Sequence, residues 1–188
     1  MGKPTAMMTT SPTIYYVLGA IVLILVIIAV IAMARRARST ALQRRFGHEY
    51  DRVAKERGDR AEAERELARR EERVKTFKLA ELPPGARERY ADEWRQVQAR
   101  FVDEPVAALR QADSLIGNVM RDRGYPPGDF EQRAADLSPH HARVLDDYRT
   151  AHDISVRSDA DTEELRQAMV HYRTLFNDLV GPTERATA

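Results

Sequence analysis

The stretch that decides the fold runs from Ile14 to Ala34 and reads IYYVLGAIVLILVIIAVIAMA, without one charged residue. At about 1.5 Å per residue, a helix of this length crosses a hydrocarbon core of roughly 30 Å. The run is apolar on every face, whereas a buried helix of a soluble protein would be shorter or carry a polar stripe. The sequence therefore predicts a transmembrane helix at 14–34, preceded by a short polar leader at 1–13.

A cleaved signal peptide is the alternative interpretation of this run, because Ala32, Met33 and Ala34 form an A-x-A pattern at its end. Three features oppose cleavage. Only Lys3 marks a basic n-region, the apolar run exceeds the usual length of about 7 to 15 residues, and arginines follow the site directly. An uncleaved anchor is favoured, and export of the domain remains the alternative.

Basic residues flank the apolar run unequally, with Lys3 before it and five arginines after it. The more basic flank of a transmembrane helix stays in the cytoplasm. We therefore expect a single-pass protein of the cell membrane, with its N-terminus outside and its C-terminal domain cytoplasmic; an extracytoplasmic domain is the alternative. The same arginines are expected to contact anionic lipid headgroups: Arg35, Arg36, Arg38, Arg44 and Arg45.

Charge is segregated along the rest of the chain. Residues 35–81 hold 15 basic against 10 acidic side chains, and residues 82–188 hold 14 against 19. The helix expected at 162–180 carries Glu163, Glu164 and Asp178 against Arg166 and Arg173. Phosphate would repel such a net acidic reader helix, so no nucleic-acid partner is expected. The chain has no cysteine, which excludes disulfides and thiol catalysis.

Residues 35–81 are expected to form two helices. The first, at 35–58, is basic and amphipathic, and its apolar stripe consists of Leu42, Phe46, Tyr50 and Val53. After Gly58, the pair Asp59 and Glu62 resembles a capping box and opens a second helix. Because most residues from 59 to 75 are charged, 59–81 is predicted to be a solvated helical stalk. A coiled coil is a weaker alternative, since half of its heptad d positions would be charged.

Residues 82–181 are predicted to form a soluble, antiparallel bundle of about four helices, so the fold class is all-α. Pro83 and Pro84 break the chain, and amphipathic helices follow near 85–101 and after Pro105, the latter with Val106 facing inward. A third helix is expected to begin at Ser138, after a short turn near 129–136, and a fourth at a capping box of Asp161 and Glu164. The tail at 182–188 is expected to be disordered.

Several short motifs accompany the N-terminal anchor: FGHEYDR at 46–52, WRQVQ at 94–98, FVD at 101–103, RGYP at 123–126 and LRQAM at 165–169. With the anchor, they resemble a group of small, uncharacterised single-pass membrane proteins of bacteria, common in actinobacteria. The resemblance covers nearly the whole chain. It implies the architecture described above and transfers no activity, cofactor or site residue.

No pattern in the chain indicates catalytic, metal-binding or cofactor-binding residues. His48 and Glu49 are followed by Arg52 where a zincin helix needs its second histidine, and the pair His140 and His141 lacks a ligand partner at helical spacing. No P-loop, G-x-G-x-x-G or G-x-S-x-G motif occurs. We therefore expect no cofactor and no metal.

Three aromatic residues, Trp94, Tyr125 and Phe130, could form a surface for a protein partner. The favoured alternative is that they pack in the core. These observations predict a membrane-tethered, non-enzymatic interaction or scaffold module. An enzyme or a small-ligand binder, with a site assembled inside the bundle, is the alternative.

Overall fold

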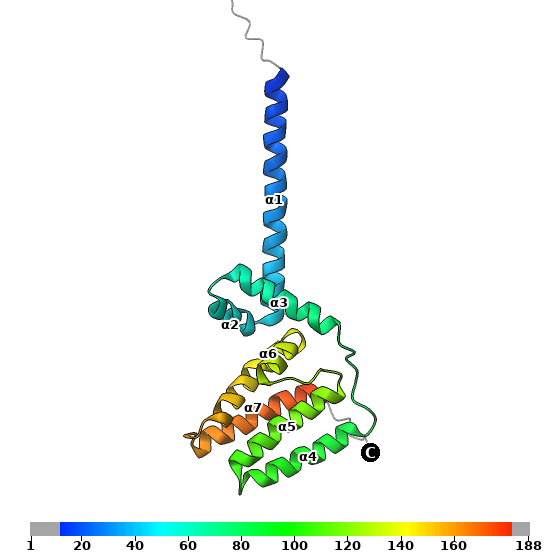
Figure 1. Ribbon diagram of the computed structural model, residues 1–188, viewed down its shortest axis with the longest axis vertical. Coiled ribbons are helices and arrows are strands. Elements are labelled where there is room, and N and C mark those ends of the chain that lie inside the picture. Colours follow the sequence, from blue (N-terminus) through cyan, green and yellow to red (C-terminus); the bar gives the residue numbers. More distant parts are fainter. Residues whose placement is uncertain (1–11, 182–188) are drawn as a thin grey trace, which may run out of the picture. The chain divides into compact units, whose positions relative to one another are not determined.

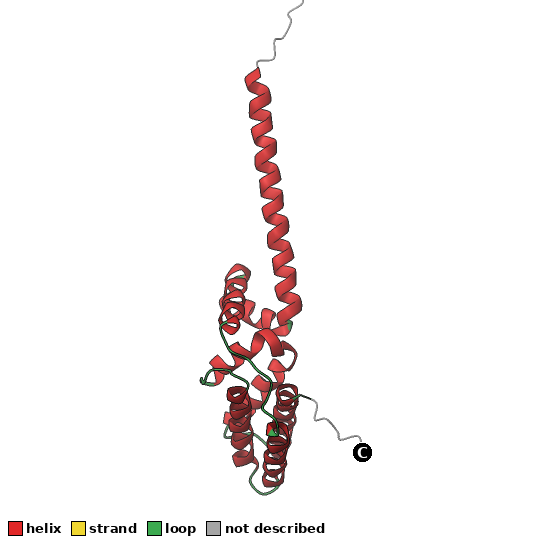
Figure 2. Cartoon of the chain, turned by 90° about the vertical axis from the view of Figure 1, so that its right-hand side faces the viewer, coloured by secondary structure: helices red, strands yellow, loops and turns green. Residues whose placement is uncertain are grey.

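A computed structural model describes residues 12–181, and over these residues the chain is helical throughout and contains no strand (Figures 1 and 2). This confirms the all-α prediction. Seven helices follow in order: α1 (Pro12–Phe46), α2 (His48–Arg57), α3 (Arg60–Lys75), α4 (Ala86–Phe101), α5 (Pro105–Asp122), α6 (Phe130–Val156) and α7 (Thr162–Val180). The chain divides into two compact units, Met1–Ala41 and Leu42–Ala188, here called the N-terminal and C-terminal units.

The described part of the N-terminal unit is the apolar length of α1. Its large hydrophobic side chains from Leu18 to Met33 are exposed. The helix at Leu18–Phe46 is long and apolar enough to cross a membrane, and its apolar 18-residue window has a mean hydropathy of 2.8. The expectation of one long apolar N-terminal helix is therefore confirmed. The leader at 1–13 lies almost wholly outside the described residues, as does the tail at 182–188.

In the C-terminal unit, α7 packs against both α5 and α6, and α4 packs on α5 (Figure 1). The predicted capping box starts α7, where Asp161 accepts a hydrogen bond from the Glu164 N–H and Glu164 returns one from the Asp161 N–H. A hydrophobic core fills the space between these helices. Trp94 of α4 stacks on Phe176 of α7 at 4.7 Å between ring centroids, so the outermost helix is tied into the same core.

Helix α6 differs from the prediction of a short turn followed by a new helix at Ser138. A first helical segment runs from Phe130 through Pro139 to His141, whose backbone angles are not helical (φ −122°, ψ 26°), and a second continues from there to Val156, so the break lies at His141 and not at Ser138. A proline inside a helix removes one backbone donor and crowds the preceding turn. The Ser138 hydroxyl donates to the Ala135 carbonyl within that turn instead of capping a new helix. Asp129 is the N-cap, and it accepts from the Gln132 N–H.

The segment between α3 and α4 crosses the end of α5. The Ala80 N–H donates to the Arg123 carbonyl at 3.0 Å. Gly124 has a positive φ of 92°, and a Cβ atom there would lie 2.3 Å from the Lys78 carbonyl oxygen. Only glycine therefore allows the two backbones to approach this closely.

The predicted solvated stalk is wrong for α3, because its narrow apolar stripe is buried. The chain breaks at Gly47 and Gly58, so α2 folds back against α3, and both helices pack on α6. The apolar stripe of each helix is too narrow to form a core alone, but the two stripes cover each other. The resulting second cluster contains Leu42, Phe46, Tyr50, Val53, Ala63 and Leu67. The helix expected at 35–58 is likewise interrupted at Gly47. The apolar positions proposed for a coiled coil are thus covered within this chain.

Glu49 lies completely buried where α2, α3 and α6 meet. Its carboxylate accepts hydrogen bonds from Arg52 (2.7 and 2.8 Å), from Arg70 of α3 (2.8 Å) and from Arg149 of α6 (3.3 Å). Burial raises the pKa of Glu49, but the Arg52 hydrogen bond and the surrounding arginine charges outweigh it, so the pKa is lowered overall. One carboxylate therefore joins three helices.

A second buried carboxylate, that of Asp136 on α6, strengthens the same junction. It accepts hydrogen bonds from Arg73 of α3 at 2.9 Å and from Gln132 at 2.8 Å. The C-terminal unit therefore begins before α2, and the bundle predicted at 82–181 is only part of it.

Replacing Glu49 by glutamine should destabilise the C-terminal unit by about 3 kcal/mol, because the arginines would lose their buried counter-charge. Since the folded-state pKa is lowered, this contribution is present above the unfolded pKa, near 4.5, and is lost as pH falls through the lower folded value. Denaturant unfolding of the full chain in detergent, followed by fluorescence of its single tryptophan, Trp94, measures both effects.

Glu56→Gln is the matched control, because Glu56 lies on the same helix, is half exposed and pairs with Arg52 alone among the described residues. Its loss should stay below about 1 kcal/mol. Equal losses for the two variants, or an unchanged response to acid in Glu49→Gln, would contradict the assigned role of Glu49.

Candidate functional site

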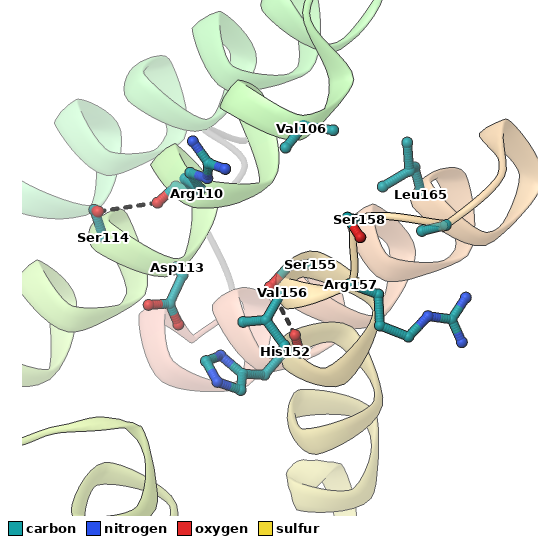
Figure 3. Close-up of a pocket in the computed structure, with 11 residues that line it drawn as sticks. Val106, Arg110, Asp113, Ser114, His152, Ser155, Val156, Arg157, Ser158 and Leu165 are labelled. Atoms are coloured by element: carbon teal, nitrogen blue, oxygen red, sulfur yellow. Dashed lines mark hydrogen bonds between the residues drawn. The ribbon is translucent and has the colours of Figure 1, made fainter.

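A cavity of about 650 Å³ opens between α5, the end of α6 and the start of α7 (Figure 3). We call it the α5–α6 cavity. Helix α5 and the last turns of α6 form its two sides, and the 157–161 loop with the first turn of α7 closes one end. Its lining residues are Val106, Arg110, Asp113, Ser114, His152, Ser155, Val156, Arg157, Ser158, Ala160 and Leu165.

Two exposed valines give this cavity an apolar side. Val106 is 39% exposed and Val156 is 65% exposed, although Val106 was expected to face inward. Among the described residues of the C-terminal unit, the other large hydrophobic side chains this exposed are Val102 and Val170. Two of the four exposed large apolar side chains of this unit thus line the cavity, and covering them would be favourable by about 25 cal/mol per Å².

Asp113 forms the polar wall on the α5 side, and its own chain satisfies both of its oxygens. Arg133 donates to Oδ2 at 2.7 Å, and the Tyr148 hydroxyl donates to Oδ1 at 3.2 Å. Burial raises the pKa of Tyr148, and the negative charge of Asp113 raises it further. The phenol therefore stays protonated and remains a donor to Asp113.

The serine hydroxyls of the cavity also bond within the chain. Ser155 Oγ donates to the His152 carbonyl at 2.8 Å and lies 3.2 Å from the Tyr172 hydroxyl, while Ser114 Oγ donates to the Arg110 carbonyl. The His152 ring stacks on Phe130 at 3.6 Å between centroids. Over residues 12–181, no hydrogen bond joins a serine hydroxyl to a histidine ring.

The two arginines of the cavity differ in their partners. Arg157 pairs with Glu164 and with Asp159. Arg110 is exposed, and within the described part of the chain no carboxylate lies at ion-pair distance from it. The cavity therefore combines an apolar side with one available guanidinium, which suits a bound group that is apolar along its length and carries an acid.

Of the three aromatic residues considered as a partner surface, two follow the favoured alternative and pack in the core. Trp94 and Tyr125 are buried in the core, and burial raises the pKa of Tyr125 to about 12. Phe130 is partly buried between Tyr148 and His152, where it supports the cavity wall from behind. Aromatic side chains have the largest apolar area, so their burial in the core is strongly favourable.

The five arginines expected at the lipid surface have different surroundings. All are exposed, and Arg35, Arg36, Arg38 and Arg44 form no ion pair within residues 12–181. Arg45 differs, because its Nη1 pairs with Glu71 at 2.8 Å and its Nε donates to the Pro139 carbonyl at 3.2 Å. Arg45 is therefore held by the C-terminal unit.

Comparison of the chain with protein-family models, with curated proteins and with solved structures finds no match. The resemblance to small bacterial membrane proteins stays a prediction. Within residues 12–181, the acidic and histidine side chains form no cluster of three that could hold a metal ion. The functional argument therefore rests on the geometry of this chain.

The bond that holds Asp113 can be tested with two tyrosine variants. Tyr148→Phe should lower the free energy of unfolding by about 2 kcal/mol, because it removes a hydrogen bond to a charged group. Tyr172→Phe removes a bond to a neutral hydroxyl and should cost about 1 kcal/mol. Denaturant unfolding followed by Trp94 fluorescence measures both, and a larger loss for Tyr172→Phe would show that Tyr148 does not hold Asp113.

Proposed function

We propose that this chain is a single-pass membrane protein that tethers a helical interaction domain to the cytoplasmic face of the cell membrane. The observation that carries the proposal is the uncharged apolar run of α1, whose side chains from Leu18 to Ala34 are exposed. Exposing such a surface to water is unfavourable, whereas lipid accepts it on every side. The uncharged run from Ile14 to Ala34 has 21 residues, and its length of roughly 30 Å as a helix matches the hydrocarbon thickness.

The proposed orientation follows from the arginines that succeed the apolar run. Three of them, Arg35, Arg36 and Arg38, follow the run directly and keep exposed guanidinium groups that can meet anionic headgroups. Moving them across the membrane would oppose both the insertion preference and the membrane potential. The C-terminal unit is therefore placed in the cytoplasm.

Within the C-terminal unit, α4 to α7 act in this proposal as an antiparallel bundle that α2 and α3 brace. The α5–α6 cavity is its contact for a protein partner, because its two exposed valines offer apolar area and Arg110 offers a charge. Its hydroxyls and Asp113 already bond within the chain, which favours binding over catalysis.

A second candidate function is the binding of a small ligand in the same cavity. Its volume of about 650 Å³ falls within the range of roughly 300–1,000 Å³ that is typical of ligand sites. An amphipathic ligand would place its apolar part on Val106 and Val156 and its acid near Arg110.

Topology can be tested with single cysteines, because the chain has none of its own. In intact cells, a membrane-impermeant thiol reagent should label Ser11→Cys and not Val102→Cys. Val102 is 81% exposed, so it will react whenever the reagent reaches it, and labelling after permeabilisation is the control. Labelling of Val102→Cys in intact cells, or a purified chain that begins at Arg35, would place the domain outside.

The partner contact can be tested by placing a photo-activatable amino acid at Val156, with Val170 on α7 as the matched control. Val170 is comparably exposed and does not line the cavity. Illumination of cells should produce one discrete protein adduct from position 156 and none from 170. Equal adducts at both positions would contradict the cavity as the contact, and a retained small molecule without a protein adduct would favour the ligand-binding alternative.

A further inference from the structure

A second cavity, of about 270 Å³, lies within the C-terminal unit where α1 ends and α2 begins beside α6. We call it the arginine cavity. Arg44, Arg45 and His48 line it from the α1–α2 side, and Arg143 and Asp146 line it from α6, just after the bend at His141. Three guanidinium groups thus face one carboxylate.

The three arginines of this cavity are not equivalent. Arg45 is fixed in place by Glu71 and by the Pro139 carbonyl. Arg44 and Arg143 are exposed, and no carboxylate in residues 12–181 lies at ion-pair distance from either. The cavity therefore contains one positioned guanidinium and two that are available to an anion.

The single carboxylate of the cavity is engaged. Asp146 Oδ2 lies 2.9 Å from His48 Nδ1, so a hydrogen bond to the histidine ring occupies it. Glu49, in the first turn of α2, is occupied by its own three arginines. A hydrogen bond does not cancel the charge of Asp146, but Arg44 and Arg143 together carry two positive charges against this one, so the cavity keeps a net positive charge.

Gly47 contributes an independent feature to the arginine cavity. It is the N-cap of α2, has a positive φ of 51° and provides no side-chain hydrogen bond to the first turn. A Cβ atom built there would meet nothing within 4 Å. The start of a ten-residue helix is thus open on the side that lines the cavity, and the partial positive charge of a helix N-terminus favours an anion.

We propose that the arginine cavity binds a phosphate group that carries two negative charges. The forked donors of arginine match the oxygens of a phosphate, and a dianion uses the excess positive charge better than a carboxylate would. This inference goes beyond the proposed anchoring and depends on contacts of residues 42–188 alone.

Two sources could supply this phosphate. Arg44 follows Ala34 by ten residues of α1, which is about 15 Å of helix. The headgroup layer on each side of a bilayer is roughly 5–8 Å thick. The first source is a lipid, which could reach the cavity only with a phosphomonoester that projects beyond its glycerol phosphate. The second source is a soluble phosphomonoester.

The test uses the full chain in nanodiscs of neutral phosphatidylcholine and measures binding by titration calorimetry. In one arm, inorganic phosphate and glycerol phosphate are added in solution. In the other, nanodiscs contain a phosphatidylinositol monophosphate, and phosphatidylglycerol, whose phosphodiester carries one charge, serves as the comparison; native mass spectrometry counts the retained lipid. Binding in the first arm assigns a soluble source, and preferential retention only in the second assigns the headgroup.

Arg143→Gln should weaken binding in the responding arm about tenfold or more, because a charge-assisted hydrogen bond is lost. Arg143 is exposed and lies outside the 35–45 cluster, so the variant leaves the proposed anchor intact. Arg173→Gln on α7 is the control, since it removes the same charge from an exposed position outside the cavity and should leave binding unchanged.

Absence of binding in both arms would overturn the proposal. Equal weakening by Arg143→Gln and Arg173→Gln would overturn it too, because the attraction would then come from net charge and not from the cavity. If the chain does not insert into nanodiscs, the anchoring proposal fails alone. Both arms are then run in buffer, with the soluble phosphates in one and a short-chain, water-soluble phosphatidylinositol monophosphate in the other, and absence of binding to all of them overturns the phosphate site.

Discussion

The fold of the C-terminal unit depends on a single buried carboxylate. Glu49 can lie out of water only if enough positive charge surrounds it, because an unpaired buried charge is unfavourable by several kcal/mol. The required arginines come from α2, α3 and α6, and Arg149 follows Glu49 by 100 residues in the chain. The carboxylate is therefore satisfied only when the α2–α3 pair has docked on α6, so the pairing selects one arrangement of these helices.

Docking of α2 and α3 on α6 has consequences for both cavities, because α6 contributes to each. Residues 142–146, just after the bend at His141, line the arginine cavity, and residues 152–156 line the α5–α6 cavity. Asp136 and Pro139, just before the bend, are held by Arg73 and Arg45. The bent helix is thus fixed on the side of α2 and α3 by polar contacts and on the side of α7 by the hydrophobic core.

The two cavities differ in chemistry because different groups of their lining residues are already bonded within the chain. In the α5–α6 cavity, Asp113 and the hydroxyls have partners in the same chain, so exposed valines and Arg110 remain available. In the arginine cavity, the acids are engaged and guanidinium groups remain. The groups available for binding in each cavity are therefore those that form no ion pair or hydrogen bond with the rest of the chain. Trp94, Tyr125 and Phe130, which were considered as a partner surface, are absent from both linings, because burial of their large apolar area in the core is more favourable.

The sequence by itself determined the features that depend on neighbouring residues: the apolar length of α1, the all-helical class, the N-caps at Asp59 and Asp161, and the breaks at Gly58 and Gly124. It could not show that the charged helix α3 is buried along one narrow stripe, since a stripe of that width forms a core only when a second one covers it. Nor could it bring Arg143 beside Arg44, or Val156 beside Val106, because those approaches follow from long-range packing. Only the tertiary structure decided which charges are paired, and so which remain free to bind.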